Sequence, residues 1–559
     1  MDAVYFIGDQ RLLWGPWQAL ERDTARLLLH LGFSDVRLVG GSGDKGADVL
    51  GVKNGELWVM QCKYTSGTPP PRAVGEVVNA AQYYSASRLA VVLSRPATDG
   101  VFAEVARYRR LGAEVDVIDS GRILKLVRQA PEYAPARREL RPYQEDASDR
   151  LRSALTDTGR GQIVMATGLG KTVVMAETVA DLLRDGILPN HRILVMVDKK
   201  EIVRQLNQAF WYQLPKWIPT HLLMGDEKPA FWEGITFGTV QSVANMLDIM
   251  PEFDLVLVDE AHHVGAGIFR DVLEALEPTM LGGCTATPWR GDGYDIDAIL
   301  GPPQVRIGIA EGLANGFLAE VDYRLLADDI DWSIVQDRSR HHYALGQLNT
   351  RLIVPPRDDE AAKLICSTFR DERRRSAVVF SPSIEHAEYF AKVLASFGLR
   401  ARCVSSEMTM RERDVLLSNF RSGSFDAVTT VDLFNEGVDV PDVDMIVFMR
   451  VTHSRRIFVQ QLGRGLRISA GKDRLIVLDF VTDLRRIAEV VHLDRAVRGG
   501  DVERVGLGRH VLEFQDKTAG DFMREWMLDQ ASLVERGADA RLELPSFNYP
   551  APANPGGVQ

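Results

Sequence analysis

One stretch, Met165-Ala-Thr-Gly-Leu-Gly-Lys-Thr172, restricts what this chain can fold into more than any other. It lies between a strand-like run at residues 162–164 and a helix-like run at residues 173–183. A strand, a glycine-rich turn and a helix that begins with Lys-Thr place backbone N–H groups and a helix N-terminus around a phosphate. The stretch therefore predicts a nucleotide-phosphate cradle. A chance Gly-Lys-Thr in a surface loop is the alternative interpretation.

Within this cradle, Lys171 is predicted to reach the outer phosphates and Thr172 to bind Mg²⁺. The predicted nucleotide contacts are Thr167, Gly168, Leu169, Gly170, Lys171 and Thr172. Gln144 follows Leu140-Arg-Pro-Tyr upstream of the cradle, and its amide can both donate to and accept from an adenine edge. An ordinary helix start explains Gln144 without a ligand.

A second motif, Asp259-Glu260-Ala-His262, follows the strand-like run at residues 254–258. Strand-like and helix-like runs alternate between the cradle and this motif, which predicts a parallel sheet with its ligand at the carboxyl ends of the strands. There Asp259 can hold Mg²⁺ through water, and Glu260 can take the proton of the water that attacks the terminal phosphate. The alternative is a strand end with two solvated carboxylates.

Two further motifs extend the pattern. Thr285-Ala-Thr287-Pro is followed by Trp-Arg-Gly-Asp-Gly, and Thr239-Val-Gln241 stands upstream. Together with the cradle, in which Met165 replaces the glycine of the strict pattern, they resemble a superfamily 2 helicase of the DEAH-box kind, related to type III restriction subunits, UvrB and XPB. The resemblance implies that Thr285 and Thr287 hydrogen-bond the Asp-Glu pair. It also implies that Thr239 and Gln241 contact a nucleic-acid backbone.

A second alternating region, at residues 376–479, resembles the second RecA-like lobe of such helicases. The sequence Asn-Glu-Gly437-Val-Asp439-Val-Pro is similar to their coupling motif, and Gln-Gln-Leu-Gly-Arg464-Gly-Leu-Arg467 to their arginine-finger motif. The resemblance implies that Gly437 and Asp439 bind the nucleotide. Guanidinium groups of Arg464 and Arg467, three residues apart on a predicted helix, would stabilise charge on the transferred phosphoryl group. Alone, the arginine pair is explained by a solvated helix face.

The first 130 residues carry a different constellation. Apolar residues at helical spacing predict a helix at residues 17–31 that contains Glu21. Asn54-Gly55 between two apolar runs predicts a β-hairpin. Because side chains alternate along a strand, Gln61 and Lys63 share a face, and the hairpin can bring Asp48 beside them.

These side chains have a chemical use together. Asp48 and Gln61 can give oxygen ligands to Mg²⁺, Lys63 can orient a water or steady charge on a phosphate, and Glu21 can complete the site. With the order of elements at residues 15–128, Gly-Ala-Asp48 and Gln61-Cys-Lys63 resemble the Mrr-type restriction endonuclease domain, a PD-(D/E)xK nuclease. Gln61 stands at the usual acid position, a variant of Mrr-like members. A degenerate domain that only binds DNA is the alternative.

Composition narrows the class of protein. The 559 residues have a net charge of −11 and no apolar run near the ~20 residues of a membrane span, so we expect a cytoplasmic protein without a membrane partner. The acidic start of the chain does not resemble a signal peptide. Nucleic-acid binding needs only a local basic stripe, and residues 450–467 hold five arginines without an acid. Such a run can also be a solvated face.

We therefore predict an α/β protein: an N-terminal restriction-endonuclease-like αβ domain, two RecA-like parallel-sheet lobes and a short helical C-terminal region. The predicted boundaries are a nuclease domain at 1–130, a linker at 131–139, an ATP-binding lobe at 140–325, a connector with a short helix at 326–357, a second lobe at 358–484, a helical region at 485–544 and a flexible tail at 545–559. The four cysteines show no zinc spacing.

The expected function is ATP-driven translocation on, or unwinding of, double- or single-stranded DNA, coupled to Mg²⁺-dependent cleavage for restriction of foreign DNA. The expected cofactors are ATP and Mg²⁺, with DNA and proteins of defence or repair systems as partners. Three alternatives stay open: a repair helicase-nuclease, a DNA-remodelling ATPase whose N-terminal domain only binds DNA, and an enzyme acting on RNA.

Overall fold

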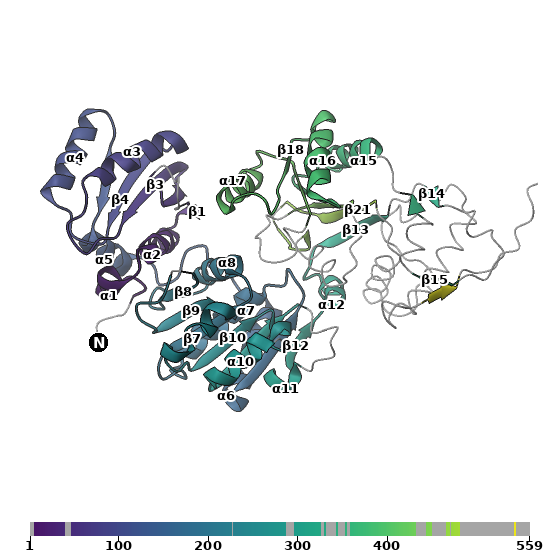
Figure 1. The fold of residues 1–559 in the computed structure, drawn as a ribbon, viewed down its shortest axis with the longest axis horizontal. Coiled ribbons are helices and arrows are strands. Elements are labelled where there is room, and N and C mark those ends of the chain that lie inside the picture. The colour runs from purple at the N-terminus through teal and green to yellow at the C-terminus, as the bar shows by residue number, and fades with distance from the viewer. Residues whose placement is uncertain are drawn as a thin grey trace, which may run out of the picture. The chain divides into compact units, whose positions relative to one another are not determined.

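The computed structural model describes residues 5–39, 46–225, 227–265, 267–286, 296–325, 329–330, 342–344, 353–354, 358–431, 443–449, 465–469, 471–480 and 541–543. The chain forms two compact units. One unit comprises Met1–Met165 with Gly170–Arg306, and the other comprises Ala166–Leu169 with Ile307–Gln559. The first unit contains the N-terminal αβ domain and the first parallel-sheet lobe, and the second contains the second lobe (Figure 1).

The N-terminal domain is built on a five-stranded mixed sheet in the order β1-β2-β3-β4-β5. Its strands are β1 (Ser34–Leu38), β2 (Val49–Lys53), β3 (Glu56–Lys63), β4 (Arg88–Leu93) and β5 (Val115–Ile118). Strands β1 to β3 pair antiparallel, and β3 to β5 pair parallel. The predicted hairpin is confirmed, because Asn54 and Gly55 both have positive φ, as a tight β2–β3 turn requires.

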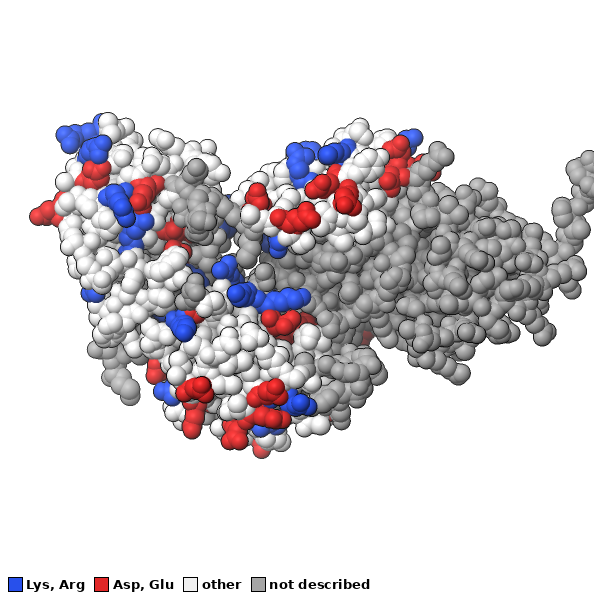
Figure 2. All heavy atoms as spheres, viewed as in Figure 1, with Lys and Arg blue, Asp and Glu red and all other residues white. Residues whose placement is uncertain are grey.

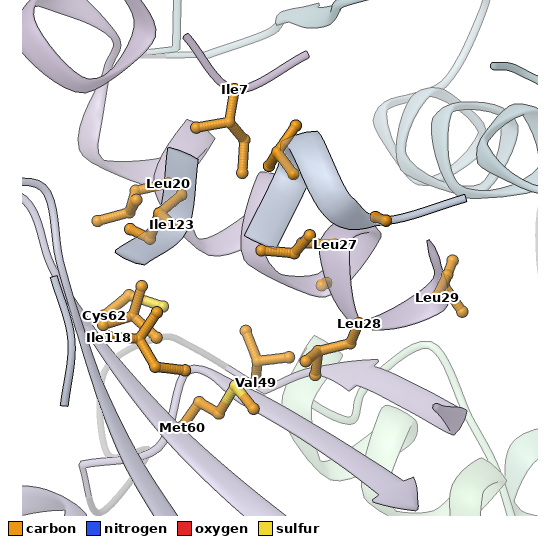
Figure 3. Close-up of a cluster of buried hydrophobic side chains, with 14 of the residues drawn as sticks. Ile7, Leu20, Leu27, Leu28, Leu29, Val49, Met60, Cys62, Ile118 and Ile123 are labelled. Carbon is orange, nitrogen blue, oxygen red and sulfur yellow. The ribbon is translucent and has the colours of Figure 1, made fainter. Parts of the chain in front are cut away.

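Helices cover both faces of this sheet. They are α1 (Asp9–Trp14), α2 (Trp17–His30), α3 (Arg72–Tyr84), α4 (Asp99–Arg110) and α5 (Ser120–Gln129). On one face, buried side chains of α2 and α5 pack on β2 and β3, among them Leu20, Leu28, Val49, Met60 and Ile123 (Figure 3). On the other face, α3 and α4 bury a second apolar cluster against the sheet. The domain is therefore a three-layer αβα sandwich.

The first lobe is a seven-stranded sheet in the order β12-β6-β11-β10-β7-β9-β8. Its strands are β6 (Arg160–Met165), β7 (Arg192–Val197), β8 (Thr220–Leu223), β9 (Gly234–Thr239), β10 (Leu255–Asp259), β11 (Met280–Thr285) and β12 (Pro303–Ile307). Its helices are α6 (Pro142–Thr158), α7 (Lys171–Arg184), α8 (Lys200–Trp211), α9 (Val240–Ala244), α10 (Gly267–Leu276) and α11 (Asp297–Leu300). Strands β6 to β11 pair parallel, so their carboxyl ends share one edge, as predicted.

Residues 131–139 between the domain and this lobe are irregular but firmly held. The backbone N–H of Lys216 donates to the Glu132 carbonyl at 2.7 Å, and the Arg137 side chain forms an ion pair with Glu177 at 2.6 Å. Ala134 is buried in the apolar cluster of the N-terminal domain. The prolines of this segment correctly indicated an irregular backbone, and its contacts make it a packed connection.

The second lobe is a six-stranded parallel sheet in the order β13-β21-β20-β17-β19-β18. Its strands are β13 (Glu320–Leu325), β17 (Ala377–Phe380), β18 (Ala401–Cys403), β19 (Ala427–Thr430), β20 (Met445–Phe448) and β21 (Arg474–Asp479). Its described helices are α12 (Ile309–Ala314), α15 (Asp358–Asp371), α16 (Ile384–Ser396) and α17 (Met410–Arg421). We predicted that the first lobe extends to residue 325. This boundary is wrong, because β13 pairs with β21 and is therefore an edge strand of the second lobe.

Two regions differ from the predicted connector helix and helical C-terminus. In the connector, the described residues are strands: β14 (Asp329–Ile330), β15 (His342–Ala344) and β16 (Ile353–Val354). β14 pairs with β16, and β15 pairs antiparallel with β22 (Arg541–Glu543). The three described residues of the predicted C-terminal helical region are thus a strand, and its other residues lie outside the described ranges.

Among the described residues, no helix has the length and apolar character needed to cross a bilayer. On the face shown in Figure 2, described Lys and Arg side chains stand in small groups interspersed with Asp and Glu. Two arginines of the second lobe are ion-paired. Arg374 pairs with Asp473 at 2.8 Å, and Arg400 pairs with Asp426 at 2.6 Å.

Candidate nucleotide and nuclease sites

The predicted phosphate cradle lies between β6 and α7. Strand β6 ends at Met165, and α7 begins at Lys171. Gly168 and Gly170 have φ of 96° and 88°, a left-handed conformation that L side chains rarely adopt. The Lys171 ammonium donates to the Met165 carbonyl at 3.2 Å. The predicted order of strand, glycine-rich turn and helix start is therefore confirmed, and the contacts of Lys171 and Thr172 with phosphate and Mg²⁺ stay predictions.

Gln144 lies directly against this cradle. A Cβ placed on Gly170 would meet the Gln144 amide nitrogen, and the left-handed φ of 88° at this position also favours glycine. The Gln144 side-chain oxygen also accepts the Arg141 backbone N–H at 3.0 Å and thus caps the start of α6. The helix-start interpretation is therefore confirmed. Gln144 also lies next to Gly170 of the cradle, so its contact with a nucleotide stays a prediction.

Asp259 ends β10 beside Cys284 of β11, its register partner. Its carboxylate accepts the Glu260 backbone N–H at 3.0 Å and the Cys284 thiol at 3.0 Å. Burial, together with the negative charge of Glu260, raises the pKa of Asp259, and the nearby Lys171 charge opposes this shift. A cation beside Asp259 would stabilise its ionised form, so this partly buried carboxylate fits the predicted Mg²⁺ site with Thr172.

Glu260 connects to the following strand through His262. Glu260 has a φ of 51°, which turns the chain sharply after β10. Its carboxylate lies 3.3 Å from His262 Nδ1, and the same nitrogen lies 3.0 Å from the Thr285 hydroxyl. We predicted that Thr285 would bond the Asp-Glu pair, and the structure links Thr285 to Glu260 through His262. Thr287 lies outside the described residues.

The residues predicted to contact a nucleic-acid backbone differ in exposure. Thr239 is buried, and its hydroxyl caps α9 by accepting the Ser242 N–H at 3.2 Å. Gln241 is exposed on α9, where its amide donates to the Asn245 side chain at 3.3 Å. Thr239 thus has a structural role of its own, and Gln241 is the more accessible of the two.

Of the second-lobe residues, Gly437, Asp439 and Arg464 lie outside the described ranges. Arg467 is exposed and has no helical backbone, unlike Gly465 two residues before it, so the predicted helix does not include Arg467. No motif pointed to Lys472, a buried lysine whose ammonium donates to the carbonyls of Gly465, Arg467 and Val443. It ties this arginine-bearing segment to the start of β20.

The predicted trio of the N-terminal domain meets at the β2–β3 hairpin. Asp48 and Gln61 are both 3% exposed, and the Gln61 amide nitrogen donates to the Asp48 carboxylate at 2.6 Å. The same carboxylate oxygen accepts the Cys62 backbone N–H at 2.6 Å. The prediction that the hairpin brings Asp48 beside Gln61 agrees with these distances.

The donor set fits a hard cation. Gln61 Oε1 is buried and has no hydrogen-bond partner among the described residues, although buried carbonyl oxygens are ordinarily satisfied. Together with the Asp48 carboxylate it offers two oxygens of the kind Mg²⁺ binds. Within the described part of the chain, no group of three or more His, Cys, Asp and Glu residues could hold a metal ion.

Lys63 is held by a residue that the sequence did not single out. Its ammonium lies 2.6 Å from the Glu76 carboxylate on α3, and Arg72 approaches the same carboxylate at 3.7 Å. The Glu76 backbone also explains Gly46, because a Cβ there would be 2.6 Å from the Glu76 carbonyl. Glu76 is therefore an additional candidate site residue.

Glu21 lies on α2, which packs on the same strand. The Cys62 thiol contacts Thr24 of α2 at 3.6 Å, and Leu20 belongs to the same cluster (Figure 3). Burial raises the pKa of Cys62, and the charges of Asp48 and Glu21 raise it further. The charges of both carboxylates therefore act on this strand, and the role of Glu21 in the site stays a prediction.

Three family models match the chain. Residues 15–127 match the restriction endonuclease model, residues 137–290 match the type III restriction enzyme res subunit, and residues 360–469 match the helicase conserved C-terminal domain. Each match covers one of the domains described above.

Among curated proteins, the chain is similar to the putative ATP-dependent helicase IRC3 of Saccharomyces cerevisiae, with 25% identity over 61% of this chain. It is 28% identical over 65% of its length to the putative mitochondrial ATP-dependent helicase irc3 of Schizosaccharomyces pombe. The matches span 51% and 60% of those relatives.

Among solved structures, the Type ISP restriction-modification enzyme LlaBIII bound to DNA aligns with a TM-score of 0.50 and 16% identity, over 84% of this chain and 38% of that one. At this identity the likeness concerns the fold. With the three family matches, these findings show that the chain fuses a Mrr-type restriction endonuclease domain to the ATP-binding and C-terminal domains of a superfamily 2 helicase, the domain set of an ATPase and nuclease enzyme.

Proposed function

We propose that this protein is an ATP-driven DNA translocase or helicase that cuts DNA with its N-terminal domain. The observation that supports the proposal is that one compact unit holds two separate groups of polar side chains. The cradle with Asp259 and Glu260 suits phosphoryl transfer, and the buried Asp48–Gln61 pair suits a cation for phosphodiester cleavage.

For ATP hydrolysis, Lys171 binds the outer phosphates and Glu260 takes the proton of the attacking water. Thr172 and Asp259 would hold Mg²⁺, which would supply positive charge against the developing phosphate charge. The chain from Glu260 through His262 to Thr285 connects this chemistry to β11. Arg464 and Arg467 are proposed to supply positive charge from the second lobe. The nucleotide contacts Gln144, Gly437 and Asp439 belong to this proposal.

For DNA cleavage, Asp48 and Gln61 would hold the cation, and Glu21 would add negative charge near it. Mg²⁺ bound there would activate water and stabilise charge on the scissile phosphate. Lys63 steadies the developing negative charge, and Glu76 keeps the Lys63 ammonium in place in the free protein. Gln241 is proposed to contact the DNA backbone, with Thr239 supporting it from the start of α9.

We propose a cytoplasmic role in restriction of foreign DNA, because the chain matches restriction enzyme models at both its nuclease domain and its ATP-binding lobe. A repair enzyme would use the same chemistry on host DNA. Cleavage maps on modified and unmodified DNA distinguish these roles, since restriction predicts that modification changes cleavage and repair predicts dependence on DNA structure.

A second candidate function is a DNA-remodelling ATPase whose N-terminal domain binds DNA without cutting it. One observation favours it: an amide rather than a carboxylate faces Asp48, which leaves less negative charge for a cation than two acids would.

The experiment that separates the candidates uses the full chain with circular and linear DNA, Mg²⁺ and ATP. Nicking by wild type and its loss in Lys63→Ala, with ATPase retained, is expected for a nuclease. ATP hydrolysis without nicking in either protein selects the non-cutting candidate. Lys171→Ala should abolish ATP hydrolysis, and normal turnover in that variant contradicts the motor.

A further inference from the structure

The N-terminal domain shares part of its core with the ATP-binding lobe. Trp211, at the end of α8 in the lobe, is 2% exposed and belongs to the same buried cluster as Phe6, Leu27 and Leu29 of the N-terminal domain. Its indole N–H donates to the Thr220 hydroxyl at the start of β8 at 3.1 Å. The apolar interior is therefore continuous from the nuclease domain to the edge of the lobe.

Charged side chains of α1 and α2 complete this junction. Arg26 is fully buried and donates to the carbonyls of Ile218 and Pro215 at 2.7 and 2.9 Å. Arg11 donates to the Thr220 carbonyl at 2.8 Å, and Arg22 pairs with Glu227. A buried guanidinium group is costly unless acceptors surround it. Since the lobe supplies the acceptors for these three arginines, docking stabilises their buried positions.

The lobe reaches back to the nuclease domain through Lys216. Its ammonium donates to the carbonyls of Val127, Arg128 and Ala130, at 3.1, 2.8 and 2.7 Å. These carbonyls lie at the C-terminal end of α5, where free acceptors and the helix dipole favour a cation. The junction is thus held from both sides.

Helix α2 serves both the junction and the nuclease site. Arg22 and Arg26 are four residues apart and lie on one stripe of the helix, toward the lobe. Glu21 precedes Arg22 by one residue, and the contact of Thr24 with Cys62 places the helix against β3. A displacement of α2 from the lobe would therefore also move Glu21 relative to Asp48 and Gln61.

We propose that α1 and α2 dock the nuclease domain on the β8 edge of the ATP-binding lobe, and that the docked lobe holds Glu21 in the nuclease site. The nuclease domain then moves with this lobe as one body, and its cation site is complete only when docked. The second part of the proposal rests on the nuclease function proposed above, and the first part does not.

The test uses full-length Arg22→Ala and Lys216→Ala, with Arg152→Ala as the matched control. Arg152 forms an exposed ion pair with Asp185 inside the lobe, away from the junction. Lys216→Ala removes contacts at the rim and leaves both cores intact, so it remains informative if Arg22→Ala folds poorly. Amide hydrogen exchange of residues 17–30 and 215–223 reports docking without requiring any activity.

Both junction variants are expected to increase exchange in the two segments by about tenfold or more, with the control unchanged. They should also raise the Mg²⁺ concentration that gives half-maximal cleavage, with the ATPase rate within about twofold of wild type. Unchanged exchange overturns the docking. Increased exchange with a wild-type Mg²⁺ dependence of cleavage overturns the claim that docking keeps Glu21 in the nuclease site. Absence of cleavage in wild type contradicts the nuclease function, and hydrogen exchange still decides the docking.

Discussion

The carboxylate of Glu76 lies 2.6 Å from the ammonium of Lys63, which connects helix α3 to the end of β3. The two side chains are 33% and 25% exposed, so water and DNA phosphates can reach the pair. An acid that fixes a lysine in the free protein can release it to a phosphate without a large change of geometry. This contact makes the position of Lys63 dependent on α3.

Glu76→Ala is therefore expected to slow DNA cleavage by about 10- to 100-fold, because the Lys63 ammonium would no longer be held in one orientation. ATP hydrolysis should stay at the wild-type rate. Single-turnover cleavage and DNA affinity measure the effect, and Glu104→Ala is the control, since Glu104 pairs with Arg107 outside the site. Cleavage by Glu76→Ala at the wild-type rate contradicts a positioning role.

Gln61→Glu tests the cation site. The Gln61 amide lies 2.6 Å from the Asp48 carboxylate, so a glutamate there would bring two negative charges together. Their repulsion should lower the melting temperature without divalent metal, and Mg²⁺ should restore more stability than in wild type. Melting in EDTA and in Mg²⁺ checks this outcome. An equal Mg²⁺ effect in both proteins would show that no cation binds at this pair.

The buried His30 is expected to make the folded protein less stable in acid. Burial, with the positive charge of Arg26 adding to it, lowers the pKa of His30 from 6.5 to about 3. The unfolded chain then binds a proton that the folded chain does not, so stability is full above about pH 6.5 and falls as the pH drops toward 3. At about pH 5 the cost is about 2 kcal/mol.

Denaturant unfolding at two pH values measures this effect, with His30→Asn as the non-titrating variant. Asparagine keeps a donor for the Pro131 carbonyl, which His30 Nδ1 contacts at 3.1 Å. His221 has a pKa lowered in the same direction, so the pH dependence should shrink without vanishing. A pH dependence identical to wild type would exclude His30 as its source.

Gly170→Ala should weaken nucleotide binding by about tenfold or more, because the added methyl group meets the Gln144 amide and forces a left-handed alanine. Gly186→Ala is the matched control, since Gly186 also has positive φ but nothing within 4 Å of its Cβ position. Binding of a fluorescent ATP analogue compares the two. Equal affinity in both variants would mean that the Gln144 contact does not shape the cradle.

Local patterns in the sequence were sufficient for much of the fold. Asn54-Gly55 identified the hairpin, and the stretch ending in Lys171-Thr172 identified a strand, a cradle and a helix, because neighbouring residues determine these elements. The adjacency of Asp48 to Gln61 followed from hairpin pairing and side-chain alternation. Both candidate sites were therefore recognisable before any long-range contact was known.

Long-range contacts were not predictable in this way. The bonds of Arg26 join residues about 190 positions apart, and no periodicity indicates such a pairing. Chain order does not show which sheet an edge strand joins, so β13 was assigned to the wrong lobe. His262 was read only as part of a motif, although its ring links Glu260 to Thr285.

The central claim is that one chain couples an ATP-driven motor to a DNA-cutting site. The most direct measurement is a time course of plasmid cleavage and phosphate release for wild type, Lys171→Ala and Lys63→Ala, in Mg²⁺ with ATP. Our account predicts that wild type shows both activities, that Lys63→Ala hydrolyses ATP without cutting, and that Lys171→Ala neither hydrolyses ATP nor cuts efficiently. Cleavage by Lys171→Ala at the wild-type rate would contradict the coupling.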